Sequence, residues 1–175
     1  MPRMIKYAVV STKWGDVLLA GKSRGLCGLL LPNGSKNDPH RRAKKHWPGA
    51  MLAGSLLQDL QGLIVRYFDG EVVDFSHVPA DLSELSDFQR RVLASCKRIE
   101  YGRTVSYGEM AKAIGQPKAG RAVGAALAAN PIPLVIPCHR VVGGDGEMVG
   151  FSAEQGTKLK KRLLDLEAGR VAVVA

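Results

Sequence analysis

Residues 106–140 read SYGEMAKAIGQPKAGRAVGAALAANPIPLVIPCHR, and this stretch decides the fold of the second half of the chain. Ser106 and Glu109 have the spacing of a capping box, which predicts the start of a short helix. Residues 115–118 end that helix, and a second helix is expected over 119–129. Two short helices joined by a turn that contains glycine are typical of a helix-turn-helix.

The second of these helices has an outward face of small residues. At 100° per residue, Arg121 shares one side of the helix with Gly124, Ala125 and Ala128. A helix that reads base edges in the major groove normally presents several long polar side chains. This face favours approach to the minor groove, which is about 6 Å wide, with Arg121 as the inserted side chain. Alternatively, the small residues serve only tight helix packing, since a helix-turn-helix is a weak functional signal.

Cys138 follows an apolar, strand-like segment (132–136) and stands directly before His139. A cysteine after such a segment is usually a small core hydrophobe. The neighbouring histidine favours a reactive thiol, because imidazole titrates near neutrality and thiolate is the nucleophilic form. Adjacent residues on an extended chain point to opposite faces, so contact between the two side chains needs a kink, a helical turn or an intervening water.

The last predicted helix offers a partner for His139. Leu159, Leu163 and Leu166 form its buried stripe, and Glu167 lies at the edge of that stripe. A carboxylate that borders a core needs a hydrogen-bonding partner, and His139 is the candidate. A plain surface glutamate is the alternative.

The first half of the chain has β-type patterns. Apolar runs separated by turn residues predict an antiparallel meander over 6–10, 17–20 and 26–31, with Cys27 as a small buried hydrophobe. Residues 32–50 carry a basic cluster and are expected to form a loop whose charge faces solvent. A helix over 52–67 and a short strand over 72–75 follow.

Residues 79–85 indicate a linker, which divides the chain into an N-terminal β-sheet and helix domain (1–80) and a C-terminal domain (81–175). Ser86 and Gln89 form a further capping box, after which Val92 and Cys96 lie on a core-facing side. The thiol of Cys96 is therefore expected to be inert. The predicted fold class is α+β.

Composition excludes several classes of protein. The three cysteines are odd in number, far apart and without metal-ligand spacing, which predicts a reducing compartment, no disulfide framework and no metal. No apolar run reaches about 18 residues, and the N-terminus has no signal-peptide core, so we expect a cytoplasmic protein without membrane contact. The net charge of +9 fits polyanion binding and a merely solvated cationic surface equally well.

Residues 88–167 resemble the active-site domain of the O6-alkylguanine-DNA alkyltransferases, also called methylated-DNA–protein-cysteine methyltransferases. The strings that carry the resemblance, in family order and at nearly family spacing, are Tyr101–Tyr107, Arg121–Gly124, Asn130–Pro133, Ile136–Val142, Gly150–Ser152 and Leu163–Glu167. The N-terminal segment is similar to the family's other domain, with a looser match. The resemblance implies a ribonuclease-H-like sheet and helix domain followed by a mostly helical, winged-helix-like domain.

The resemblance also implies direct-reversal DNA repair. A monomer without a cofactor would flip O6-alkylguanine, or alternatively O4-alkylthymine, out of double-stranded DNA and move its alkyl group irreversibly to Cys138. His139 would deprotonate the thiol through a water, Glu167 would hold the imidazole, and Tyr107 would protonate the departing guanine.

The remaining family positions match residues around the DNA and the flipped base. The residues expected at the DNA are Ser106, Arg121, Ala122, Gly124 and Ala125. The residues expected to line or brace the base pocket are Asn130, Pro133, Val141, Phe151 and Ser152.

The chain departs from the family pattern at three places. Glu100 stands where the family has proline, and Phe151 replaces the usual tyrosine near the pocket. The segment after Ser152 is two residues longer than in the family and borders the alkyl pocket, which affects the adduct size that the pocket accepts.

Three other functions compete with alkyl transfer. Alkyltransferase-like binding modules recognise the lesion but replace the acceptor cysteine, and the presence of Cys138 argues against them. The bare face of the second helix argues against a transcription factor. A cysteine hydrolase would need an oxyanion-hole motif and would leave the helix-turn-helix unexplained.

Overall fold

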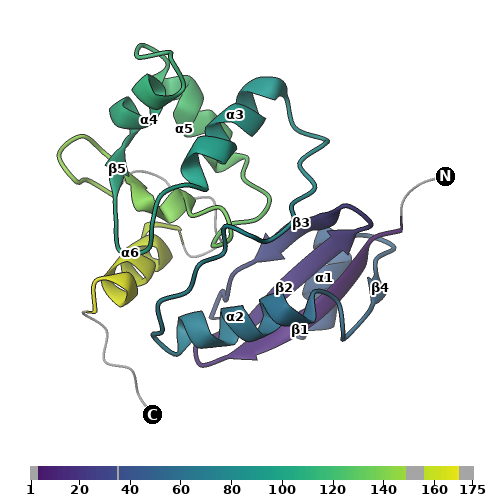
Figure 1. Cartoon of the computed structure of the whole chain (residues 1–175). Coiled ribbons are helices and arrows are strands. Elements are labelled where there is room, and N and C mark those ends of the chain that lie inside the picture. The colour runs from purple at the N-terminus through teal and green to yellow at the C-terminus, as the bar shows by residue number, and fades with distance from the viewer. Residues whose placement is uncertain (1–3, 35, 149–155, 170–175) are drawn as a thin grey trace. The chain divides into compact units, whose positions relative to one another are not determined.

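The computed structural model describes residues 4–34, 36–148 and 156–169. The chain divides into two compact units, and the boundary between them along the sequence falls between Leu82 and Ser83. The first unit contains β1 (Lys6–Thr12), β2 (Gly15–Lys22), β3 (Gly25–Leu30), α1 (Pro39–His46), β4 (Met51–Leu52) and α2 (Gln58–Phe68) (Figure 1). The second contains α3 (Asp87–Cys96), β5 (Val105–Ser106), α4 (Tyr107–Ala113), α5 (Gly120–Ala128), the 3-10 turn η1 (Cys138–Arg140), β6 (Val141–Val142) and α6 (Gly156–Glu167).

The first unit is a four-stranded sheet in the order β3-β2-β1-β4. β1 pairs antiparallel with β2, β2 pairs antiparallel with β3, and β4 is parallel to β1, so the predicted meander is confirmed. α1 packs against the face that carries Tyr7 and Leu18, and α2 lies over the opposite face (Figure 1). Because helices cover both faces, the central residues of the strands are apolar on both sides of the sheet, whereas polar residues lie at the strand ends. Cys27, expected to be buried, is half-buried in β3.

The expectation of a loop over 32–50 was wrong, because this segment contains α1. The Asp38 side chain accepts a hydrogen bond from the backbone of His40, and Pro39 occupies the first turn, so the helix has a strong start. Ala43 is buried against the sheet. Arg41, Lys44, Lys45 and His46 face solvent as expected, whereas Arg42 is half-buried and donates from Nη2 to the Leu31 carbonyl at 2.7 Å.

Two further expectations in the first unit need correction. The helix predicted over 52–67 begins at Gln58, because Leu52 and Met51 are taken up as β4, whose neighbour Ala53 donates from its backbone to Tyr7 at 2.8 Å. Residues 72–75 pair with no strand of the described residues, although Val73 and Phe75 are buried. The alternation of buried and exposed side chains in this segment is typical of a strand, but the segment forms no hydrogen-bonded pairing with a neighbouring strand.

In the second unit both predicted capping boxes are formed. Ser86 and Gln89 cap α3, and Ser106 and Glu109 cap α4, each with reciprocal side-chain and backbone bonds. The turn between α4 and α5 passes through Gly115 at φ +76°, and the predicted helix-turn-helix is confirmed.

Residues 132–136 are buried as predicted, but they form a tight turn rather than a strand. The backbone N–H of Ile136 donates to Ile132 at 3.0 Å, and Leu134 has a left-handed φ of 74°. A left-handed backbone conformation at a residue other than glycine destabilises the fold by about 1–3 kcal/mol and persists only where surrounding contacts hold it. The Asn130 side chain donates to the Ile136 carbonyl at 2.9 Å and accepts from the Ile132 N–H at 3.0 Å, so it braces both ends of the turn.

No helix within the described ranges is both long and apolar enough to cross a membrane. The same ranges contain no cluster of three or more histidine, cysteine, aspartate or glutamate side chains that could hold a metal ion.

Candidate active site

Cys138, His139 and Arg140 form η1, a single buried turn with exposed fractions of 5%, 0% and 6%. The turn of residues 132–136 leads the chain into η1, and the chain then continues directly into β6. β6 pairs in parallel with β5, with Val141 opposite Val105. Since α4 begins immediately after β5, this pairing holds the reactive turn close to the start of the helix-turn-helix.

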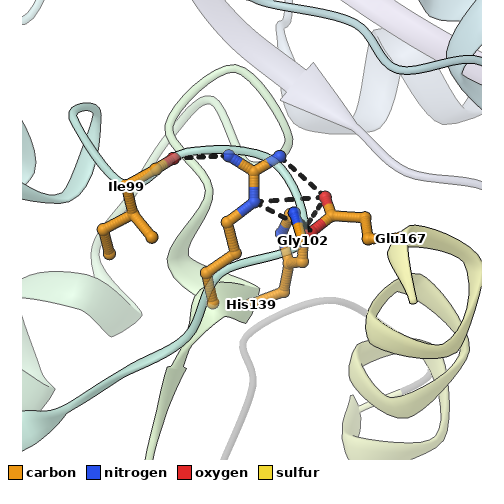
Figure 2. A network of polar contacts seen from close by, with 5 residues as sticks. Ile99, Gly102, His139 and Glu167 are labelled. Carbon is orange, nitrogen blue, oxygen red and sulfur yellow. Dashed lines mark hydrogen bonds and ion pairs between the residues drawn. The ribbon is translucent and has the colours of Figure 1, made fainter.

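Glu167 reaches the same turn from the end of α6. Its Oε1 lies 2.9 Å from Nε2 of His139, and both side chains are almost fully buried (Figure 2). A carboxylate can only accept hydrogen bonds, so Nε2 carries the proton. The backbone N–H of Gly102 donates to Oε2 at 3.3 Å (Figure 2). Leu163 and its apolar neighbours on α6 are buried as predicted and fix the register of the helix.

Arg140 is the nearest additional partner of Glu167, and the sequence reasoning gave it no role. Its Nε donates to both carboxylate oxygens at 3.1 and 2.9 Å, and its Nη2 donates to Oε1 at 2.7 Å. Its Nη1 donates to the carbonyl of Ile99 at 2.6 Å. The available signal was the arginine that directly follows the histidine in the Cys-His-Arg string, because one buried carboxylate readily accepts hydrogen bonds from two basic side chains.

The charges of this network make His139 a neutral base. Burial opposes ionisation of Glu167, but hydrogen bonds from His139 and Arg140 outweigh it and hold the pKa of the carboxyl at about 2. Burial lowers the pKa of His139, although Glu167 raises it. Nδ1 of His139 is buried and has no hydrogen-bond partner among the described residues. At neutral pH the imidazole therefore offers a lone pair at Nδ1.

Cys138 rests as a protonated thiol. Burial raises its pKa, while the Asn130 side chain and the positive charge of Lys160 lower it in part. A thiol in this state needs a base at the moment of attack, which a neutral histidine can supply. Cys96 is fully buried, and its pKa lies well above the ordinary value, chiefly through burial, so the expected inertness of its thiol agrees with its surroundings.

Lys160 is a second residue that the sequence reasoning missed. It lies on α6 with 1% of its surface exposed, and Nζ is 5.8 Å from the centroid of the Tyr107 ring. A lysine on an amphipathic helix normally faces solvent, so only the packing reveals it. Burial and the neighbouring Cys138 raise the pKa of Tyr107, which keeps its phenol protonated and able to donate.

The outward face of α5 is as bare as predicted. Arg121, Ala122 and Ala125 are exposed, and Gly124 is half-buried. A Cβ atom at Gly124 would lie 3.8 Å from Cε1 of Tyr107, so this face adjoins the tyrosine ring.

Comparison with known proteins identifies the family. Residues 87–169 match the model described as 6-O-methylguanine DNA methyltransferase, DNA binding domain, and residues 5–82 match its ribonuclease-like domain. The methylated-DNA–protein-cysteine methyltransferase of Mycobacterium tuberculosis is 38% identical over 170 residues, which cover 95% of this chain and 94% of the relative. The chain belongs to the 6-O-methylguanine DNA methyltransferase family.

Other relatives of this methyltransferase agree. The Mycobacterium leprae protein of the same name is 44% identical over 168 residues, covering 96% of this chain and 95% of its own. The crystal structure of Mycobacterium tuberculosis OGT in complex with DNA superposes with a TM-score of 0.79 at 34% identity and covers 96% of each chain. The predicted α+β fold, with its ribonuclease-like and DNA-binding domains, is confirmed, and the protein is a DNA-binding methyltransferase of DNA repair.

The structure describes some of the remaining predicted site residues of the methyltransferase and not others. Val141 is buried directly after η1, Pro133 is buried in the turn of residues 132–136, and Ser106 uses its hydroxyl to cap α4. Phe151, Ser152 and residues 153–155 of the longer segment lie outside the described residues, and α6 begins at Gly156.

Proposed function

We propose that this methyltransferase reverses DNA damage directly, by moving the alkyl group of a flipped O6-alkylguanine irreversibly to Cys138. Each molecule would act once, and O4-alkylthymine is the alternative substrate. The observation that carries the proposal is the buried turn in which Cys138 adjoins a histidine fixed by Glu167 at 2.9 Å. Such a pair activates a weak nucleophile.

In the reaction, His139 takes the thiol proton at Nδ1 through a water. The sulfur of Cys138 then attacks the saturated carbon, the S–C bond forms, and the C–O6 bond breaks with its electron pair moving to guanine. Tyr107 donates a proton to the guanine, which improves it as a leaving group. The products are a thioether and unmodified guanine, and Glu167 stabilises the imidazolium that forms.

The duplex would meet the bare face of α5. The target atom lies inside the base stack, so the nucleotide must leave the stack at a cost of a few kcal/mol. Arg121 would occupy its place from the minor groove, and small residues allow the close approach. The other residues proposed at the DNA are Ser106, Ala122, Gly124 and Ala125.

The flipped base would be held by the segments around η1. Asn130 would brace the turn before the nucleophile, as its two buried hydrogen bonds suggest. The other residues proposed for the pocket are Pro133, Val141, Phe151 and Ser152. DNA binding and chemistry would belong to residues 81–175 and not to residues 1–80. The protein would act as a cytoplasmic monomer without a cofactor or metal.

The direct test uses duplex DNA that contains one O6-methylguanine. Intact-mass and peptide analysis should show one added methyl group on the peptide that contains Cys138. Cys138→Ala should show none, and Cys96→Ala, which removes another buried thiol, should still be methylated. Binding of the lesion without a change in mass would overturn the proposal and favour a recognition module.

A further inference from the structure

The Glu167 carboxylate is shared unequally between its two basic neighbours. Arg140 makes three contacts of 2.7–3.1 Å with both oxygens, whereas His139 makes one contact with Oε1. The guanidinium is itself held in place, because Nη1 donates to Ile99 and the group lies 5.7 Å from the centroid of the Tyr101 ring. Arg140 is therefore fixed in one orientation by the network that it completes.

We propose that Arg140 is a positioning residue of the alkyl-transfer site, which binds both oxygens of Glu167 and so limits the share of that carboxylate's charge that acts on His139. The inference rests on the proposed function, in which His139 is the base. A buried histidine beside an unshared carboxylate would tend to become imidazolium, which has no lone pair to accept the thiol proton. Arg140 prevents this while Oε1 still orients the Nε2–H.

The groups around His139 act in opposite directions. The charged residues of the described part of the chain that act on it are Glu167 and Lys160 of α6 and Arg140 of its own turn, in which Cys138 is the preceding residue. Burial lowers the pKa of His139, Glu167 raises it, and Arg140 and Lys160 lower it further. Loss of the guanidinium should therefore raise the pKa of His139.

The ring of Tyr101 lies beside the Arg140 guanidinium, and burial together with Glu167 raises the pKa of its phenol, which Arg140 lowers in part. Tyr101 therefore stays neutral in the range where His139 titrates. This neutral ring therefore does not add to the effect of the Arg140 charge on His139.

The test compares Arg140→Met and Arg140→Lys in the full chain, with free O6-benzylguanine as substrate so that DNA affinity does not enter. Single-turnover rates are measured across the acid limb of the pH profile. In Arg140→Met the midpoint of that limb should move to higher pH, because more His139 is protonated at each pH. Arg140→Lys keeps a positive charge but not the two-oxygen fork, so its midpoint should stay near that of the unmodified protein while its maximal rate falls about tenfold. Arg98→Met, which removes an exposed charge, should change neither quantity.

A midpoint in Arg140→Met equal to that of the unmodified protein, with the rate reduced equally at every pH, would show a merely structural role and overturn the inference. If Arg140→Met does not fold, Arg140→Lys decides, since a maximal rate equal to that of the unmodified protein would also overturn it. Failure of the unmodified protein to methylate Cys138 from duplex DNA that contains O6-methylguanine would instead overturn the proposed function.

Discussion

Nε2 of His139 donates a hydrogen bond of 2.9 Å to Oε1 of Glu167, although the two residues lie 28 positions apart. Both side chains are buried, at 0% and 1% exposure, so the bond is shielded from water and selects one tautomer of the imidazole. The consequence is chemical: Nδ1 is left as the basic nitrogen, within the same turn as Cys138.

Glu167→Gln should slow alkyl transfer by roughly 10²-fold, the lower end of what general-base catalysis contributes. The amide oxygen can still accept from His139, but it carries no charge to stabilise the imidazolium. Single-turnover rates and duplex affinity check this, and the affinity should be largely kept. The exposed carboxylate Glu71 is the matched control, as Glu71→Gln. An unchanged transfer rate in Glu167→Gln would remove the residue from the relay.

Arg121→Ala should reduce repair of duplex DNA about tenfold or more, since the vacated stack is no longer filled by a side chain. Transfer from free O6-benzylguanine should fall much less, because a free base needs no extrusion. The measurement is the ratio of the two rates, with Arg98→Ala as a charge control. Equal loss on both substrates would refute a role in extrusion.

Ala125→Leu should weaken duplex binding by about tenfold, because an isobutyl group then projects from the exposed face of α5 where close approach is needed. Leucine is a good helix former, so the helix itself should persist. Ala94→Leu adds the same side chain at an exposed position of α3 and should bind DNA normally. Gel-shift titrations compare the two variants; similar affinities would mean that α5 does not approach the duplex.

Lys160→Met should slow transfer, because loss of the buried ammonium removes one influence that lowers the pKa of Cys138. Lys161→Met is the matched control, since this neighbour is exposed and forms a surface ion pair with Asp165 at 2.7 Å. Rates of transfer from O6-benzylguanine that fall equally in both variants would contradict the assignment.

Acid should destabilise the fold in two stages. Glu167 has a pKa of about 2 against an ordinary value of 4.5, so it contributes on the order of 3 kcal/mol above pH 4.5 that is lost as pH falls toward 2. The pKa of His139 lies below its ordinary value of 6.5, so the unfolded chain binds its proton first and stability begins to fall below that pH. Denaturant unfolding at several pH values measures this.

Glu167→Gln should lack the lower of these two stages, and Glu71→Gln should retain both. A Glu167→Gln variant whose stability falls with pH as steeply as that of the unmodified protein below pH 4.5 would place the depressed carboxyl elsewhere.

Local chemistry made much of the second unit predictable. The capping boxes that begin at Ser86 and Ser106 satisfy backbone groups within four residues, so they depend little on the rest of the molecule. The periodicity of α5 likewise separated buried Val123 from exposed Arg121. The prediction failed for residues 39–46 although Asp38 and Pro39 are local signals for the start of a helix, because the basic cluster favoured a loop. At residues 51–52, pairing with β1 overrode the helical periodicity.

The sequence by itself determined the helix-turn-helix, because capping boxes and helical periodicity act within one segment. It made Cys138 a candidate nucleophile and Glu167 a candidate partner of His139, since a carboxylate that borders a core needs a hydrogen-bonding partner. Only the tertiary structure decided that Arg140 binds both oxygens of that carboxylate and that Lys160 is buried near Tyr107. Long cationic side chains can extend toward water or fold inward. The choice depends on partners contributed by distant segments, which no local pattern specifies.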